Sequence, residues 1–243
     1  MAITKVTSGV RTLGTGEVTT ANILDGTIEN ADVSATAAIA STKVSGIVAS
    51  GLNSVQTFTS SGTWTRPSGI TKVIMEVQGG GGSGSMQTNN DYVCGGSGGG
   101  YSKKLLDVSS ISTSTITVGA GGAAQADNSI QYGYDGGASS WADGTNTITG
   151  SGGTGGTAST QYTDIAGGAA SGGDINIPGA IGGCGSYADG ASHGSMFGFG
   201  SQRAWTGETH LPNAVGYGGG GAGAYSTTSG SGAGGIIIVW EYK

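Results

Sequence analysis

The fold of this chain is decided by the stretch TFTSSGTWTRPSGITKVIMEVQGGGG, residues 57–82. Its first half predicts a β-hairpin, with Phe58 and Trp64 on either side of a turn-rich SSG. A second turn follows at residues 67–69, where proline presets φ and glycine tolerates positive φ. The second half alternates with period two, which predicts a strand whose buried face consists of Val73, Met75 and Val77. The four glycines that follow have no side chain to bury.

A second strong strand closes the chain. Residues 235–242, GIIIVWEY, are apolar on both faces, which predicts a strand that is central in its sheet or covered on both sides. Trp64 and Trp240 are accordingly assigned to the core. Between the two strong strands glycine dominates, and four weaker strands are predicted. Residues 101–108 and 113–118 are expected to form a second hairpin, and residues 139–141 and 146–149 are expected to form brief strands.

These residues have a recognisable order. The motif F-T-x-x-G-x-W-T-x-P-x-G-(I/V)-x-x-(V/I), leading into GGGG, resembles the glycine-rich domain at the distal end of tail fibres and related virion proteins of tailed bacteriophages. Three later pieces fit the same pattern, namely residues 98–122, 135–140 and 234–242. The resemblance covers residues 54–243 and implies a structural and adhesive role in the virion. It carries over no catalytic residue.

Composition limits the class of protein further. Of the 243 residues, 53 are glycine, and only 10% are charged, against about 25% in an average globular domain. A strict Gly-X-Y repeat is absent, which excludes collagen. The net charge of −6 disfavours nucleic-acid binding. Because we find neither a signal sequence nor an apolar run near 18 residues, we expect a soluble product of the host cytoplasm that a virion carries to the cell surface, without membrane insertion.

Residues 1–53 differ from the rest of the chain. They lack aromatic residues and carry isolated Ile or Val residues about every five positions, too few to form a core in one chain. We expect either a trimeric shaft that attaches to other virion tail proteins or a flexible linker, with a hinge at residues 50–54. The whole chain is thus expected to be an all-β homotrimer with an extended fibre-type N-terminal segment at 1–53. A glycine-rich, β-sandwich-like domain is expected at 54–243.

The glycine runs need a special source of order. Ordering a residue costs about 1–2 kcal/mol of conformational free energy, and glycine loses the most backbone freedom. Since glycine buries no side chain, main-chain hydrogen bonds must compensate. Polyglycine II helices packed between the strands would supply such bonds, provided that the facing positions lack a Cβ. Tight β-turns joining short strands are the alternative. Under either arrangement, loops between the runs are free to vary on a rigid frame.

Catalytic and metal chemistry find little support in the sequence. Cys94 and Cys184 could pair across a long loop, but two free buried thiols are expected, because assembly takes place in a reducing cytosol. His193 and His210 lack zinc-ligand spacing, and no cofactor is expected. Residues 79–85, GGGGSGS, are similar in sequence to a nucleotide-binding loop. Such a loop is followed by a helix, and none is predicted here, so we do not expect nucleotide binding. We therefore expect no enzyme. A carboxylate pair for glycan cleavage could come only from isolated acids, namely Asp164, Asp174, Asp189 and Glu208.

The leading functional hypothesis is a tail-fibre or tail-tip adhesin. Exposed aromatic residues beside amides and carboxylates suit recognition of a glycan or an outer-membrane protein on the host cell, because rings stack while polar groups fix orientation. The candidate receptor contacts are Asn89, Asn90, Tyr92, Tyr132, Tyr134, Trp141, Tyr187, Trp205 and His210. Two alternatives are a purely structural fibre or cap protein of the virion and a glycan-cleaving tailspike.

Overall fold

The computed structural model describes residues 51–88, 92–126, 129–159, 162–186, 191–201, 213–225 and 228–243. Contacts divide the chain into two units, Met1–Val48 and Ala49–Lys243. The predicted attachment segment lies outside the described residues except for its last three positions. The hinge expected at residues 50–54 is wrong in its second half, because a strand already begins at Leu52.

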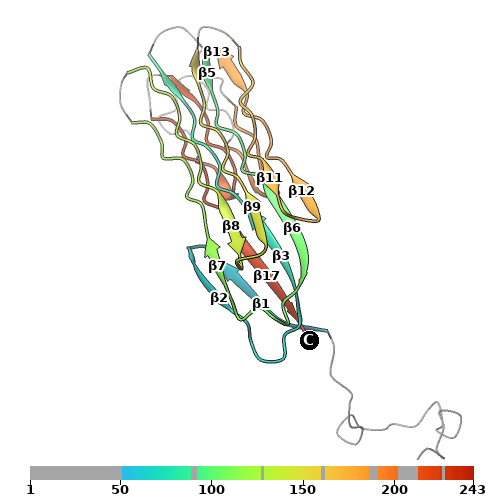
Figure 1. The fold of residues 1–243 in the computed structure, drawn as a ribbon. Coiled ribbons are helices and arrows are strands. Elements are labelled where there is room, and N and C mark those ends of the chain that lie inside the picture. The colour runs from blue at the N-terminus through green and yellow to red at the C-terminus, as the bar shows by residue number, and fades with distance from the viewer. Residues whose placement is uncertain are drawn as a thin grey trace, which may run out of the picture. The chain divides into compact units, whose positions relative to one another are not determined.

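Two five-stranded antiparallel sheets form a sandwich at one end of the second unit (Figure 1). The strand order of the first sheet is β1 (Leu52–Phe58), β17 (Ile236–Tyr242), β3 (Lys72–Gln78), β6 (Tyr101–Asp107) and β12 (Ile175–Ile177). The strand order of the second sheet is β11 (Ala170–Ser171), β9 (Thr147–Gly150), β8 (Ser139–Ala142), β7 (Thr113–Thr117) and β2 (Gly62–Thr65). The described residues contain no helix. The all-β prediction and the central place of the closing strand are confirmed.

Both predicted hairpins are wrong in their pairing. Strand β1 pairs with β17, whereas β2 pairs with β7 in the facing sheet. In the same way β6 pairs with β3, whereas β7 pairs with β2 and β8. The strands themselves lie close to where the alternation placed them. The turns pass the chain from one sheet to the other, and a local turn signal does not distinguish this crossing from a reversal within one sheet.

The interior of the sandwich is filled from both sheets. Val73, Met75 and Val77 on β3 are fully buried, as their alternation predicted. They share one cluster with Trp64 and Trp141 from the opposite sheet, whose ring centroids lie 4.9 Å apart. The core assignment of Trp64 is therefore confirmed.

The outer face of the first sheet differs from the expectation. Trp240 is only half-buried, because it alternates with the inward-facing Val239 and Glu241 of β17. The opposite face of β3, predicted to be open, is covered near its C-terminal end. There Gln78 is fully buried, and its amide Nε2 donates to the carbonyl oxygen of Gly99 at 2.8 Å.

A buried carboxylate joins the two sheets. Glu241 is fully buried and accepts hydrogen bonds from Ser54 Oγ at 2.5 Å, Gln56 Nε2 at 2.7 Å and Trp64 Nε1 at 2.7 Å. The first two donors lie on β1, and Trp64 lies on β2 of the facing sheet. Burial of a carboxylate is costly unless it is hydrogen-bonded, so these three donors fix the edges of the sandwich around β17.

Beyond the sandwich the chain continues as extended glycine-rich runs that bond to one another. Residues 79–86 leave β3 and donate their amides to three neighbouring runs in strict rotation. The donor–acceptor pairs with the first neighbour are 79–100, 82–97 and 85–94; with the second, 80–137, 83–134 and 86–131; and with the third, 81–233 and 84–230. A rotation that repeats every three residues, with no bond inside the run, defines a helix of the polyglycine II type.

Residues 79–86 are also acceptors in this lattice. Amides of three further runs donate hydrogen bonds to carbonyl oxygens of residues 79–86. In the first run Gly122 donates to residue 81, and in the second Gly153 and Gly156 donate to residues 80 and 83. In the third run Gly221 and Ala224 donate to residues 82 and 85. Six runs therefore surround this one. The returning run 94–100 repeats the pattern, with the pairs 95–183 and 98–180, 96–221 and 99–218, and 97–154 and 100–151. The predicted bundle is confirmed.

The lattice explains why its interior is glycine. A Cβ on Gly84 would lie 1.8 Å from the carbonyl oxygen of Ala222, and one on Gly81 would lie 1.9 Å from that of Gly219. Tight turns do not account for these runs, because the amides of residues 79–86 and 95–100 bond to neighbouring runs and not to carbonyls within their own run. No glycine among residues 79–100 has a left-handed φ. Several serines in the lattice use their hydroxyl as an acceptor for a neighbouring amide, as Ser83 Oγ does for the amide of Tyr134.

We predict that Gly84→Ala destabilises the protein strongly, whereas Gly62→Ala does not. The first change forces a methyl group against the backbone, which costs about 3 kcal/mol or more because the neighbouring runs cannot yield without breaking hydrogen bonds. The second adds a methyl group with nothing within 4 Å. Denaturant unfolding of both variants checks this, and equal stability of the two would contradict a backbone-packed interior.

Candidate functional site

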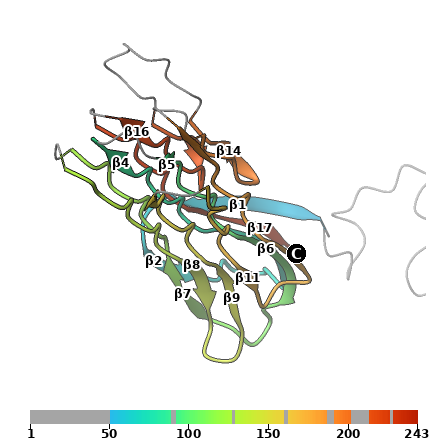
Figure 2. The ribbon, with the colours of Figure 1, turned by 90° about the horizontal axis from the view of Figure 1, so that it is seen from above.

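The end of the bundle remote from the sandwich is the candidate site. Because run 79–86 leaves β3 and run 94–100 returns to β6, Met86 and Cys94 mark that remote end. A small antiparallel sheet lies there, in the order β10 (Ala158–Ser159), β5 (Tyr92–Cys94) and β13 (Cys184–Ser186) (Figure 1). Strands β4 (Met86–Gln87) and β16 (Ala224–Tyr225) form a parallel pair near β5 (Figure 2).

A disulfide joins Cys94 to Cys184 across this small sheet. The expectation of two free thiols is therefore wrong. The redox state of the cytosol does not determine which residues lie together, whereas the register of β5 and β13 places these two cysteines directly opposite each other. The main chain of Cys94 is held in addition by Ser85, whose Oγ accepts the amide of Cys94 at 2.9 Å.

The predicted receptor contacts differ in how exposed the structure shows them to be. Tyr132 and Tyr134 are 62% and 57% exposed, on the run that returns to β8. Tyr92 is half-buried at the start of β5. Trp141 is wrong as a surface contact, because it faces the sandwich interior and is fully buried against Trp64. Asn89, Asn90, Tyr187, Trp205 and His210 lie outside the described residues.

Sequence reasoning missed Tyr162. This side chain follows β10, is 63% exposed, and meets the ring of Tyr92 edge to face with centroids 6.5 Å apart and an interplanar angle of 89°. The pairing of β10 with β5 brings the two tyrosines together although 70 positions separate them. No local motif marks Tyr162, so only the strand pairing could have identified it.

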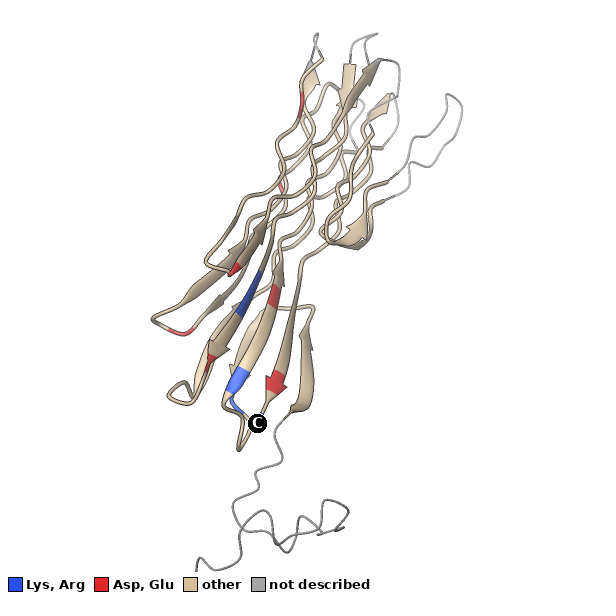
Figure 3. Cartoon of the chain, turned by 90° about the vertical axis from the view of Figure 1, so that its right-hand side faces the viewer, with Lys and Arg blue, Asp and Glu red and all other residues tan. Residues whose placement is uncertain are grey.

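Charge is concentrated in the sandwich (Figure 3). In the described part of the chain, every lysine and arginine belongs to the sandwich strands or the residues that adjoin them, namely Arg66, Lys72, Lys103, Lys104 and Lys243. The described runs beyond the sandwich carry only the acids Asp135 and Asp164. Asp135 Oδ1 accepts the amide of Gly155 at 2.7 Å and so takes part in the lattice. The described remote end therefore lacks a cationic side chain.

A shallow groove lies on the flank of the bundle. Its volume is about 410 Å³, and its walls include Ile177, Pro178, His193 and Met196 over a floor of Gly99 and Tyr101. The ring of Tyr101 packs edge to face on Phe197 of β14 (Phe197–Phe199), which pairs with β15 (Val215–Tyr217). Burial, with the charge of Glu76 nearby, raises the pKa of Tyr101 to about 12. Tyr101 therefore stays neutral at physiological pH.

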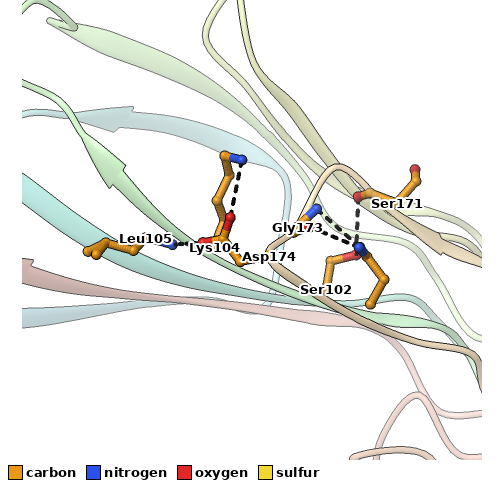
Figure 4. Close-up of polar contacts among 7 residues, drawn as sticks. Ser102, Lys104, Leu105, Ser171, Gly173 and Asp174 are labelled. Atoms are coloured by element: carbon orange, nitrogen blue, oxygen red, sulfur yellow. Dashed lines mark hydrogen bonds and ion pairs between the residues drawn. The ribbon is translucent and has the colours of Figure 1, made fainter.

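Of the four acids considered for glycan cleavage, Asp174 has structural partners and Asp164 is exposed, whereas Asp189 and Glu208 lie outside the residues that the structure describes. Asp174 accepts the amide of Leu105 at 2.9 Å and forms an ion pair with Lys104 at 3.6 Å, which fastens β12 to β6 (Figure 4). Asp107 accepts the amide of Ser109, and this bond lowers the pKa of Asp107. In the described ranges, no group of three or more His, Cys, Asp or Glu side chains could hold a metal ion. No segment there forms a helix long and apolar enough to span a bilayer.

The fold and the site define a class of protein: a β-sandwich that extends into a lattice of polyglycine II-type helices and ends in a disulfide-linked sheet with exposed tyrosines. A family model described as a glycine-rich domain matches residues 54–242, and the chain belongs to this family. No curated protein matches the chain.

We predict that replacing both cysteines with serine loosens the remote end more than the sandwich. Loss of a native disulfide costs about 2–5 kcal/mol of stability. Here the disulfide connects β5 to β13 within the small sheet of β10, β5 and β13, so its loss acts mainly on that sheet. Hydrogen exchange should rise at β5 and β13 and change little at β3. Non-reducing peptide mapping of the wild-type protein should recover Cys94 and Cys184 in one linked pair. Recovery of both as free thiols after air oxidation would contradict the pairing.

Proposed function

We propose that this protein is a bacteriophage tail-fibre or tail-tip adhesin that recognises the host cell surface with the remote end of its glycine-rich bundle. One observation carries the proposal: main-chain hydrogen bonds in three-residue rotation fix the runs, so that the residues at their ends are held with only a small side-chain cluster, Cys94, Ile165 and Cys184, beneath them. A frame of this kind leaves the sequence between the runs free to vary, which suits recognition of diverse surfaces.

The exposed tyrosines support the same function. Tyr132 lies next to Gln131, which pairs with Met86 at the remote end of the central run. Tyr134 lies one three-residue turn from Gln131, where its carbonyl accepts the amide of Ser83. Their main chain is thus already ordered. Rigid amphipathic rings of this kind provide contact area at low entropic cost.

The proposal extends to the rest of the virion. Residues 1–53 would attach the domain to other tail proteins, and three chains would associate through that segment. The protein would be made in the host cytoplasm, carried in the virion tail and active at the outer surface of the next host cell.

The test measures binding of the fluorescent full-length protein to a panel of bacterial strains by flow cytometry. We expect saturable binding to at least one strain. Truncation of both Tyr132 and Tyr134 to alanine should weaken that binding about tenfold or more, the effect typical of interface tyrosines. The matched control is Leu105→Ala, which removes a 55% exposed side chain from β6 in the sandwich and should leave binding unchanged.

Two results would contradict the proposal. Absence of saturable binding to every strain would point instead to a structural fibre or cap protein of the virion. Release of oligosaccharides from the bound cells would point to a glycan-cleaving tailspike.

A further inference from the structure

We infer that Tyr92 and Tyr162 form a stacking platform for an uncharged saccharide at the remote end of the bundle. This inference rests on the proposed function, because it names the chemical class of ligand that the adhesin would take. The two residues are called the tyrosine platform below.

The geometry leaves a ring face available. In an edge-to-face pair each ring uses at most one of its faces against the other. Tyr162 keeps 63% of its surface exposed while its centroid stays 6.5 Å from that of Tyr92. At least one face of Tyr162 is therefore not used by Tyr92. The apolar C–H face of a sugar ring stacks on such an aromatic face.

Tyr92, the member of the platform that lies on a strand, is fixed in advance. Tyr92 pairs with Ser159 of β10 on one side and with Ser186 of β13 on the other. Two residues further along β5, Cys94 is bonded covalently to Cys184. Because the backbone of Tyr92 is held from both sides, the ring against which Tyr162 packs loses little freedom when a ligand binds. Less of the stacking energy is then offset by the cost of ordering this partner.

The charge distribution selects the class of ligand. Binding of an anionic sugar, such as a phosphorylated or sulfated one, is favoured by charge-assisted hydrogen bonds from Arg or Lys side chains. The described part of the remote end holds no Lys or Arg. In the sequence the platform is flanked by two acids, Asp91 directly before Tyr92 and Asp164 two positions after Tyr162, and the structure shows Asp164 exposed. A carboxylate accepts hydrogen bonds from neutral hydroxyl groups and repels anions. The platform therefore fits a neutral sugar.

The first experiment probes the full-length protein with an array of neutral, phosphorylated, sulfated and sialylated oligosaccharides. We expect binding to neutral members only, with an affinity that changes less than about twofold between 0.05 and 0.5 M NaCl, since no ion pair is screened. Tyr162→Ala should weaken binding about tenfold or more, Tyr162→Trp should retain it, and Leu105→Ala should leave it unchanged. Matching unfolding temperatures would show that the variants are folded.

Three array results would overturn the inference: binding to no oligosaccharide, preference for anionic members with salt-sensitive affinity, or full binding by folded Tyr162→Ala. A second experiment separates this inference from the proposed function. Cells that bind the protein are treated either with periodate, which cleaves vicinal diols of sugars, or with protease. Loss after periodate alone supports the saccharide. Loss after protease alone leaves the adhesin in place and overturns the saccharide in favour of a protein receptor.

Discussion

The structure depends on one interaction, the hydrogen bond between a main-chain amide in one glycine run and a carbonyl in the next. Along residues 79–86 successive amides turn to three different neighbours and return to the first after three residues. Each bond requires the two backbones to approach closely. The clash that a Cβ would meet at Gly81 or Gly84 shows that glycine composition is a steric condition of this lattice rather than a sign of disorder.

The sandwich sets the register of the lattice. Strands β3, β6 and β17 continue directly into runs 79–86, 94–100 and 228–235, so pairing within the sheet fixes how each run starts against its neighbours. Glu241 holds β1, β2 and β17 together through its three donors. The side-chain core thus orders one end of the domain, and backbone bonds carry that order to the tyrosines at the other end.

The sequence predicts the parts of this fold that follow from periodicity. The buried face of β3, the central place of β17 and the backbone bonding of the glycine runs could all be derived from local pattern and entropy. Strand pairing could not, because the same turn residues serve a hairpin and a crossing between sheets. Without the strand pairing, the sequence could not show that Trp141 is buried, that Tyr92 contacts Tyr162, or that Cys94 lies opposite Cys184.

Amide hydrogen exchange, resolved by residue, tests the central claim most directly. If the lattice holds the domain together, the amides of residues 79–86 and 95–100 should exchange about as slowly as those of β3, because each is buried in a hydrogen bond that opens only with the bundle. Rapid exchange throughout these two runs, with protection confined to the sandwich strands, would contradict the account and remove the frame on which the remote end depends.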